Sequence, residues 1–278
     1  MRIANVDGRL KLLVHDGAID VATASGGRFD PDPARCFERF GELRNWAAAV
    51  DAPLEPFDEA ASGPPSPAPR QVFGIGLNYV DHAAESGIDL PTAPLVFTKY
   101  VSSFAGSAAH VALPKGSVDW EVEIVVVIGE VAGIVAPAHA WDVVAGLTVG
   151  QDLSERELQR SGPAPQFGLA KSYPGFSPMG PCLVTPDEFD DPDELELGCE
   201  LNGEQVQRGR STDMVFAVPE LVAYLSGIVT LLPGDVIFTG TPAGVGAGRK
   251  PPRFLQPGDV LRSWVEGIGT ITQSFAAS

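Results

Sequence analysis

Residues 120–127, Trp-Glu-Val-Glu-Ile-Val-Val-Val, predict the β-strand around which the rest of the fold is arranged. In a strand, successive side chains point to opposite faces of the sheet. Glu121 and Glu123 therefore share one face, and that face continues with Val125 and Val127. Most glutamates are exposed, so two solvated carboxylates are one interpretation. The valines favour another, in which the carboxylates lie at a partly buried edge and repel each other unless a proton or a cation lies between them.

A third acidic side chain, Asp152, follows the apolar segment 143–149. A carboxylate at the end of a strand can point into a cleft, although an aspartate here can equally be an ordinary residue at a helix start. Mg²⁺ and Mn²⁺ are hard cations that prefer oxygen ligands. We therefore predict that Glu121, Glu123 and Asp152 bind Mg²⁺ or Mn²⁺.

Strand patterns dominate the rest of the chain, and helices are few. The strand candidates are residues 72–76, 95–100, 121–128, 143–151, 198–202, 235–239 and 259–265. Apolar side chains at helical spacing predict a helix over residues 34–49. Ser154 and Glu157 match a capping box, which predicts a helix that starts at Ser154. Pro219 is expected in the first turn of a helix that ends near residue 228.

No repeated alternation of strand and helix runs along the chain, so a doubly wound sheet is disfavoured. The predicted fold class is α+β, predominantly β. The first 57 residues predict a small β-rich unit, in which segments 9–14 and 18–21 flank Asp16-Gly17, a dipeptide typical of a hairpin turn. Residues 58–70, DEAASGPPSPAPR, have four prolines and no apolar period, which indicates an extended linker. Residues 71–278 are expected to form the catalytic domain.

Charge and composition exclude several classes of protein. The 278 residues include 36 acidic and 19 basic side chains, a net charge of −17, which repels nucleic acid and anionic membranes. The three cysteines contain no CxxC pair, so neither a disulfide framework nor a structural zinc site is expected. The N-terminus lacks the apolar core of a signal peptide, and the longest aliphatic run, residues 124–128, is too short to span a membrane. We expect a cytoplasmic protein without nucleic-acid or membrane partners.

His82 and Glu85 lie three residues apart in the segment 78–85. On a short helix they share one face, and a histidine oriented by a carboxylate is a competent general base near neutral pH. An isolated pair of this kind is more often a surface histidine near an unrelated glutamate. The general base is the hypothesis that we carry forward, because the chain has only four histidines.

Polar residues further along the chain could face a substrate. Arg156 and Gln159 lie on one helical face and can present a cation and an amide to a carboxylate, and Lys171 follows them. Residues 239–246, TGTPAGVG, include Thr241 but lack the lysine and spacing of a nucleotide-binding loop. This loop is either a plain turn or one whose hydroxyls and amides face a ligand.

Five motifs occur in a fixed order along the main domain. They are GLNYVDHAAE (76–85), WEVEIVVVIG (120–129), QDLSERELQ (151–159), AKSYPGFSPMGP (170–181) and TGTPAGVG (239–246). In this order they resemble the fumarylacetoacetate hydrolase family, from residue 72 to the C-terminus. The resemblance implies a mixed β-roll with few helices, and an assembly of two or more chains, with a homodimer expected.

Matching these motifs residue by residue implies roles for the site. The resemblance assigns a bound Mg²⁺, Mn²⁺ or Ca²⁺ to Glu121, Glu123 and Asp152, and a histidine–glutamate pair on a lid-like segment to His82 and Glu85. The substrate-side residues that it implies are Arg156, Gln159, Lys171 and Thr241.

The chain departs from the family beside two of these motifs. Many members have asparagine where this chain has Gln151, directly before Asp152. Many have an acidic residue where this chain has Pro174. The second departure bears on the fit of the substrate, whereas the metal ligands are intact.

The function expected is that of a divalent-metal-dependent enzyme acting on a small anionic 2-oxo or 2,4-dioxo acid. The leading hypothesis is hydrolysis of a carbon–carbon bond in an acylpyruvate such as fumarylpyruvate, in which the metal stabilises an enolate and His82 activates water. The same enolate would serve an isomerase of the 2-hydroxyhepta-2,4-diene-1,7-dioate type in aromatic catabolism, or a decarboxylase of an oxaloacetate-like acid. A third hypothesis is a metal-binding protein without turnover.

Overall fold

The computed structural model describes residues 1–15, 17–87 and 89–278. Strands hold 36% of the residues and helices 23%. These fractions confirm the predicted α+β class with a predominance of β structure.

The largest sheet has twelve strands. Their bounds are β1 (Arg2–Val6), β2 (Arg9–Val14), β3 (Gly17–Asp20), β4 (Glu55–Pro56), β5 (Ser62–Gly63), β6 (Val72–Gly76), β7 (Leu95–Thr98), β8 (Phe104–Ala105), β11 (Val122–Ile128), β12 (Val144–Gln151), β14 (Ser177–Val184) and β17 (Val236–Phe238). Ten of them follow the order β4-β3-β2-β1-β14-β12-β11-β17-β6-β7, while β5 pairs with β1 and β8 with β14. The sheet is mixed, because β17 pairs with β6 in parallel and most other pairs are antiparallel.

Two smaller sheets complete the β structure. The first has the order β16-β15-β18-β19-β9, and in the second β10 pairs with β13. The bounds are β9 (Ala108–Leu113), β10 (Val118–Asp119), β13 (Ser154–Glu155), β15 (Glu196–Leu201), β16 (Glu204–Arg210), β18 (Val260–Val265) and β19 (Gly269–Ala277).

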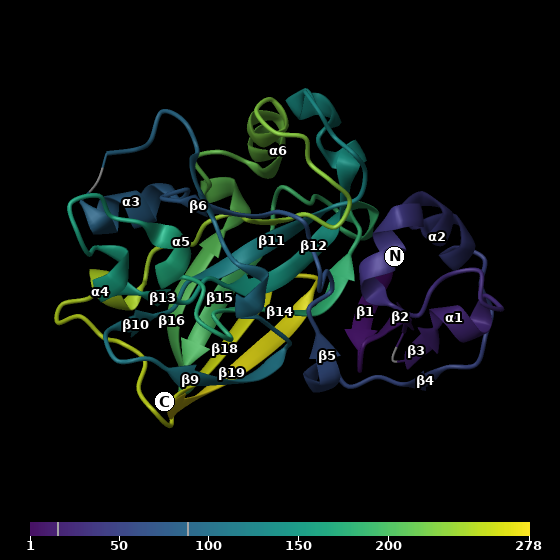
Figure 1. The fold of residues 1–278 in the computed structure, drawn as a ribbon, viewed down its shortest axis with the longest axis horizontal. Helices are drawn as coiled ribbons and strands as arrows, with labels where there is room; N and C mark the ends of the chain where they lie inside the picture. The colour runs from purple at the N-terminus through teal and green to yellow at the C-terminus, as the bar shows by residue number, and fades with distance from the viewer. Residues whose placement is uncertain (16, 88) are drawn as a thin grey trace.

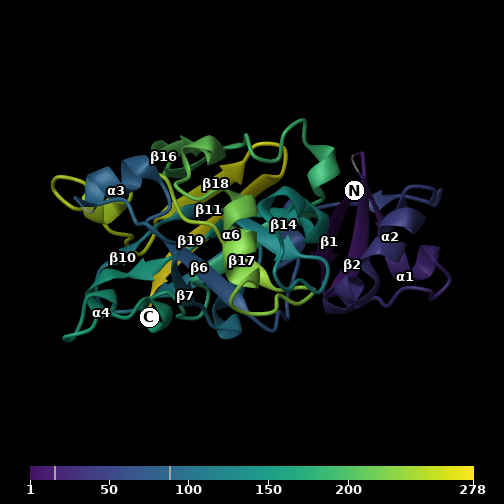
Figure 2. The same cartoon turned by 90° about the horizontal axis from the view of Figure 1, so that it is seen from above.

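The helices are short. The α-helices are α1 (Val21–Ala24), α2 (Phe40–Ala47), α3 (Val80–Ser86), α4 (Arg156–Gln159), α5 (Phe167–Ala170) and α6 (Val218–Ser226). The 3₁₀ helices are η1 (Pro33–Arg39), η2 (Glu59–Ala61), η3 (Val101–Ser103), η4 (Pro137–His139), η5 (Trp141–Val143), η6 (Pro186–Glu188), η7 (Ser211–Asp213) and η8 (Gly246–Gly248). In Figures 1 and 2, α3 and α4 lie at one end of the long axis, and the N-terminal strands and α2 lie at the other.

Strand β11 separates two apolar cores, as its alternation predicts. Trp120, Val122, Ile124 and Val126 belong to one cluster of buried residues. Val125 and Val127 belong to the other. Strand β11 pairs with β12 on one edge and β17 on the other, and the two clusters cover its two faces. The prediction that alternate side chains of this strand lie on the same face is therefore confirmed.

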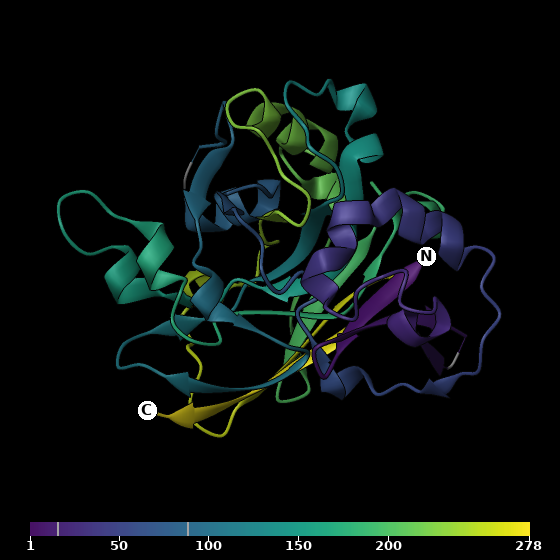
Figure 3. The same cartoon turned by 45° about the vertical axis from the view of Figure 1, so that its right-hand side comes forward.

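The strands of the N-terminal unit extend the main sheet. β1 pairs with β2 on one side and with β14 on the other. Helix α2 packs over these strands, with Phe40 and Leu43 in the same cluster as Leu10 (Figure 3). Within the predicted linker, β5 pairs with β1, and the Ser66 hydroxyl donates to the carbonyl of Gly234 at 2.7 Å. The division into unit, linker and main domain stays a prediction.

The predicted elements are recovered closely. All seven strand candidates occur, with ends shifted by at most two residues, and α6 matches the helix predicted from Pro219. The N-terminal hairpin is present, although Asp16 of its turn lies outside the described residues. The helix predicted over residues 34–49 begins as η1 and becomes α-helical in α2. Five longer strands, β1, β9, β14, β16 and β19, are not among the predicted candidates. In β14 the apolar pattern is interrupted by Pro178, Gly180 and Pro181.

The prediction that a helix starts at Ser154 is wrong. Ser154 and Glu155 form β13, which pairs with β10, and α4 begins at Arg156. Glu155 is the N-cap, because its carboxylate accepts from the amides of Glu157 at 3.0 Å and Leu158 at 2.7 Å. The Ser154 hydroxyl donates instead to the carbonyl of residue 152. The sequence pattern of a helix cap is present at Ser154, but the pairing of β13 with β10 places this residue in a strand.

Among the described residues, no helix is long and apolar enough to cross a membrane. This finding does not test the predicted cytoplasmic location, which stays a prediction.

Candidate active site

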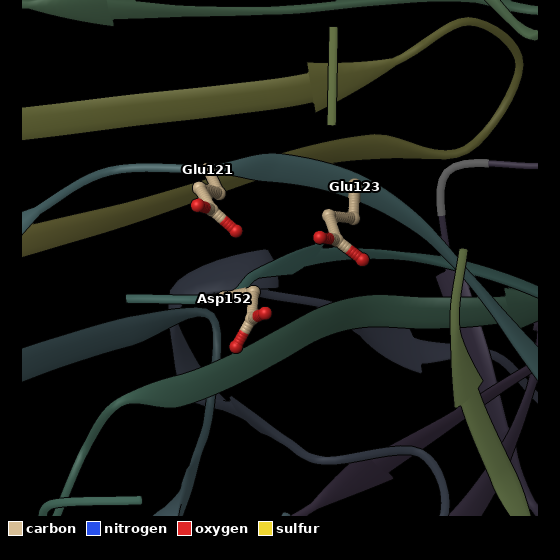
Figure 4. Close-up of side chains that lie close together, drawn as sticks. All are labelled: Glu121, Glu123 and Asp152. Carbon is tan, nitrogen blue, oxygen red and sulfur yellow. The ribbon is translucent and has the colours of Figure 1, made fainter. Parts of the chain in front are cut away.

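Glu121, Glu123 and Asp152 lie together because β11 and β12 pair in a fixed antiparallel register. Val122 lies opposite Gln151 in the ladder. The amide of Asp152 donates to the carbonyl of Glu121 at 2.9 Å. One carboxylate oxygen of each acidic residue lies within 4.8 Å of the others (Figure 4). Their exposed fractions are 5%, 1% and 1%, so the group is buried and does not form a solvated strand end.

Three buried cations surround these carboxylates. The Lys171 ammonium lies 2.6 Å from Glu121 Oε2 and 2.6 Å from Asp152 Oδ2. Lys99 forms an ion pair with the other oxygen of Asp152. Arg156 Nη2 lies 2.7 Å from Glu121 Oε1. Each cation thus holds one or two particular carboxylate oxygens in place.

A fourth buried carboxylate, Asp119, connects this group to the glycine-rich loop. Its Oδ2 lies 2.9 Å from Arg156 Nε and 2.8 Å from Nη2. The amides of Gly246 and Ala247 donate to its two oxygens at 2.6 and 2.9 Å. One side chain therefore orients both Arg156 and the backbone of η8.

The charges of this centre do not balance. Four buried carboxylates face three buried cations: Asp119, Glu121, Glu123 and Asp152 against Lys99, Arg156 and Lys171. The excess negative charge is assigned to Glu123. Its carboxylate accepts a hydrogen bond from the Gly240 amide at 2.8 Å. Burial, together with repulsion from Asp152 and Glu121, raises the pKa of Glu123 well above its usual value. Burial acts in the same direction on Glu121, but Lys171 and Arg156 outweigh it and lower that pKa to about 2.

These residues fit a bound divalent cation. All three candidate ligands are carboxylates, the donor type that hard cations prefer. A buried carboxylate without a cation is costly, and a metal ion would compensate the negative charge on Glu123. The Lys171 ammonium already bridges two of the three ligands, so the centre stabilises positive charge at that place.

His82 and Glu85 share one face of α3, as expected. His82 Nδ1 lies 3.5 Å from Glu85 Oε2 and has no hydrogen bond of regular geometry within the described residues. The Gly244 amide donates to both carboxylate oxygens of Glu85 at 3.2 Å. A side chain at Gly248 would clash with Glu85, because a Cβ there would lie 2.4 Å from its Cδ. Burial raises the pKa of Glu85, but His82 and the Gly244 amide outweigh it and lower the pKa.

Gln159 and Thr241 are both tied to the protein through their oxygens. Gln159 Oε1 accepts from Arg156 Nη1 at 3.0 Å, which leaves its NH₂ group as the one that it can offer to a ligand. The Thr241 hydroxyl donates to the carbonyl of Val122 and accepts from Gln207 Nε2, each at 2.8 Å. Thr241 therefore holds its loop against β11.

A single cavity of about 810 Å³ gathers the predicted site residues. Eight of the nine line it: His82, Glu85, Glu121, Glu123, Arg156, Gln159, Lys171 and Thr241. Asp152 does not appear in the lining and lies beneath it, in contact with Lys171. An acidic centre, a histidine–glutamate pair and several N–H donors therefore face one space.

Sequence reasoning missed Lys99 and Asp119. Lys99 lies directly after β7, and its ammonium is fully buried. The available signals were a lysine in an apolar strand and an aspartate next to the strand that is predicted to bind the metal. Neither signal indicates its partner, because Lys99 is 53 residues from Asp152 in the sequence and Asp119 is 37 residues from Arg156.

Comparisons with known proteins give a family match and similar sequences. The sequence model described as fumarylacetoacetate (FAA) hydrolase C-terminal matches residues 71–276. Oxaloacetate tautomerase FAHD2A, mitochondrial, from Homo sapiens is 40% identical over 268 residues, which is 91% of this chain and 85% of that protein.

Solved structures have the same fold. A crystal structure of a protein from Mycobacterium smegmatis superimposes with a TM-score of 0.96 and 55% identity, covering 100% of both chains. Maleylpyruvate hydrolase from Sphingobium sp. SYK-6, in complex with manganese(II) and pyruvate, has a TM-score of 0.81 and 27% identity, covering 100% of both chains. The 2-hydroxyhepta-2,4-diene-1,7-dioate isomerase from Mycobacterium marinum has a TM-score of 0.76 and 29% identity, covering 100% of this chain and 99% of that one.

Proposed function

This chain belongs to the fumarylacetoacetate hydrolase family, and we propose that it is a divalent-metal-dependent enzyme acting on a small 2-oxo acid. The leading reaction is hydrolysis of a carbon–carbon bond in an acylpyruvate. One observation carries the proposal: the three-carboxylate centre and the His82–Glu85 pair face the same cavity. The maleylpyruvate hydrolase with manganese and pyruvate supports it as a relative with that chemistry.

In this proposal Glu121, Glu123 and Asp152 hold Mg²⁺ or Mn²⁺, with Ca²⁺ as a further candidate. The ion supplies Lewis acidity to the 2-oxo group of a bound acid. Arg156 and the NH₂ group of Gln159 donate hydrogen bonds to the acid's carboxylate. These roles are supported by the placement of both residues on the cavity wall.

His82 is the proposed general base. Its Nδ1 faces Glu85, so Nε2 remains to take a proton from water. The resulting hydroxide attacks the distal carbonyl of a 2,4-dioxo acid, the bond between C3 and C4 breaks, and its electron pair is protonated to give pyruvate and a carboxylic acid. Glu85 stabilises the imidazolium while the proton is held, because the Gly244 amide fixes its carboxylate.

Proton transfer without water attack is the second candidate. A histidine that moves a proton between carbon and oxygen of a 2-oxo acid would make the protein a tautomerase or an isomerase of the 2-hydroxyhepta-2,4-diene-1,7-dioate type. The human oxaloacetate tautomerase, 40% identical over 91% of this chain, favours this candidate. Decarboxylation of an oxaloacetate-like acid uses the same polarised 2-oxo group.

A metal-binding protein without turnover is the remaining class. It requires no base near the metal, whereas His82 and Glu85 line the same cavity as the carboxylates. That arrangement favours the enzyme.

We also propose that two copies of the chain form a homodimer. Strand β7 is an edge of the large sheet, and apolar side chains on and after it are exposed, notably Leu95, Val96 and Tyr100. Leu169 of α5 is 65% exposed nearby, since α5 packs against β7. Exposed apolar edge strands are usually covered. Light scattering should give twice the chain mass of 29.2 kDa, and a monomer at micromolar concentration would contradict the dimer.

The deciding experiment follows the ultraviolet absorbance of enolised acetylpyruvate and fumarylpyruvate mixed with the protein and Mn²⁺, with and without chelator. Hydrolysis predicts a chelator-sensitive loss of absorbance with pyruvate formed in step. Oxaloacetate is tested in parallel, where faster enol–keto equilibration without loss of total acid indicates the tautomerase. Inactivity on all three acids and on the dienedioate substrate would leave the non-catalytic protein.

A further inference from the structure

Val122 lies between the two glutamates of the three-carboxylate centre, and its peptide groups are held by side chains. The pairs between β11 and β17 run from residue 125 to residue 127. The Val122 amide donates to Gln207 Oε1 at 3.0 Å, and the Val122 carbonyl accepts from the Thr241 hydroxyl at 2.8 Å. Two side chains therefore take the place of strand pairing at the end of β11 that carries the carboxylates (Figure 4).

These contacts close a ring of hydrogen bonds. Gln207 Nε2 donates to the Thr241 hydroxyl at 2.8 Å and to the Pro242 carbonyl at 2.7 Å. Gln207 Oε1 also accepts from the Cys199 thiol at 3.4 Å. The side chain is 2% exposed and uses both donors and both acceptor positions of its amide. Only one orientation of this amide fits, because the flipped one would turn its NH₂ group toward the N–H of Val122.

Gln207 and the metal centre belong to different sheets. Gln207 lies in β16, an edge strand of the five-stranded sheet, whereas Val122 begins β11 inside the large sheet. The Gln207 amide therefore joins the two sheets at the metal centre. A buried side chain with all its hydrogen bonds made can hold a site more precisely than a loop can.

The same strand supports the loop that orients Glu85. A Cβ at Gly244 would lie 2.2 Å from the Val206 carbonyl oxygen and 3.2 Å from Gln207 Cγ, so the loop packs directly on β16. The Gly244 carbonyl accepts from Trp120 Nε1 at 3.1 Å, while the Gly244 amide donates to Glu85. Strand β16 thus contacts both the metal strand and the loop that binds the histidine–glutamate pair.

We propose that Gln207 is a positioning residue that presets the spacing of the metal ligands. This inference rests on the proposed function. The side chains of Glu121 and Glu123 leave the backbone on either side of Val122, so the placement of the Val122 peptide decides where both carboxylates lie. Without the Gln207 contact, the ligands have to be ordered when the metal binds, and this ordering costs free energy. Residues that support metal ligands typically contribute about 10–100-fold to metal affinity.

The test measures the affinity for Mn²⁺ by calorimetry in Gln207→Met, which keeps the length of the side chain and removes its hydrogen bonds. The dissociation constant is expected to rise about 10–100-fold. Gln273→Met is the matched control. Gln273 is a buried glutamine of the same sheet, donates to the Ser107 carbonyl at 3.2 Å and lies outside the cavity lining. Its substitution should lower the free energy of unfolding and leave the affinity for Mn²⁺ unchanged.

A second pair of variants keeps the result readable if Gln207→Met does not fold. Thr241→Val opens the ring by removing the hydroxyl and should also weaken Mn²⁺ binding. Thr241→Ser retains the hydroxyl and should bind Mn²⁺ as the wild type does. Combining Gln207→Met with Thr241→Val should cost less affinity than the sum of the single losses, because both substitutions break one ring.

The outcomes separate the positioning role from the metal centre itself. Wild-type affinity for Mn²⁺ in Gln207→Met, or an equal loss of affinity in Gln273→Met, overturns the positioning role alone. A loss of affinity in Thr241→Ser as large as that in Thr241→Val overturns the ring. Absence of Mn²⁺ binding by the wild-type protein overturns the proposed metal centre, and the role of Gln207 with it.

Discussion

The carboxylate of Asp119 lies 2.8 Å from the guanidinium of Arg156, and their side chains are 0% and 9% exposed. Such a buried pair orients a cation strongly, and removing one member leaves a charge without its partner. Because the same carboxylate accepts from the amides of Gly246 and Ala247, the pair also ties the glycine-rich loop to the site.

Asp119→Asn should therefore weaken the site and the fold together. We expect a loss of about 3–5 kcal/mol in the free energy of unfolding. If Arg156 binds the substrate carboxylate, KM rises by about tenfold or more, with a smaller change in kcat. Chemical denaturation and steady-state kinetics measure the two effects. Glu157→Gln, which removes an exposed carboxylate next to Arg156 in the sequence, is the control and should leave both quantities within error.

Glu123→Gln should abolish tight metal binding and stabilise the metal-free protein. The folded-state pKa of Glu123 is raised, so the folded chain holds this proton more tightly than the unfolded chain does. Above the pKa of the unfolded chain, the unfolded chain loses this proton while the folded chain keeps it. The free energy of unfolding of the metal-free protein therefore falls as the pH rises, until the pH passes the raised pKa of the folded chain. The amide accepts from Gly240 as the carboxylate does, without the charge.

The measurement is the unfolding free energy of both chelator-treated proteins between about pH 4 and pH 8. The variant should be more stable by about 1–3 kcal/mol at pH 8, and the difference should vanish toward pH 4. With Mn²⁺ present the order should reverse, because only the wild type gains from metal binding. A difference that does not depend on pH would contradict the uncompensated charge on Glu123.

His82→Ala should reduce the rate while leaving the metal in place. A positioned general base contributes about 10²–10⁴-fold to the rate. Manganese affinity should be unchanged, because the candidate ligands are carboxylates on other elements. His139→Ala, which removes an exposed histidine outside the cavity lining, is the control. An unaffected kcat in His82→Ala would remove this residue from the mechanism.

Gln151→Asn should destabilise the protein. Gln151 Oε1 accepts from the amide of Glu121, and its Nε2 donates to Ser263 Oγ in β18, each at 2.8 Å. The shorter side chain cannot span both contacts, and an unsatisfied buried group costs about 1–3 kcal/mol. Thermal and denaturant unfolding measure the change, and Gln256→Asn, an exposed substitution, is the control. Wild-type stability in Gln151→Asn would mean that the bridge to β18 contributes nothing.

The alternation in residues 120–127 was sufficient to divide β11 between two cores. Its period of two decides which side chains share a face whatever the strand pairs with. The same local information placed His82 and Glu85 on one face of α3, and Arg156 and Gln159 on one face of α4.

Local signals failed where a distant partner competed with them. Ser154 has the sequence of a helix cap, but it pairs with Asp119 in a strand and leaves the cap to Glu155. Pro178 and Pro181 hide β14, although this strand joins the N-terminal unit to the main sheet. Both outcomes depend on contacts between residues far apart in the sequence.

The strand faces, the fold class and a short set of acidic, basic and histidine candidates could be predicted from the amino-acid sequence, because these depend on local periodicity and residue chemistry. The folded chain was needed to show that Asp152 lies beside Glu121, that Lys99 and Asp119 belong to the centre, and that four buried carboxylates face three cations. The pairing register of β11 and β12 brings together charges from separate segments and buries them. The energies of these charges depend on their distances and on the exclusion of solvent, which local sequence patterns do not encode.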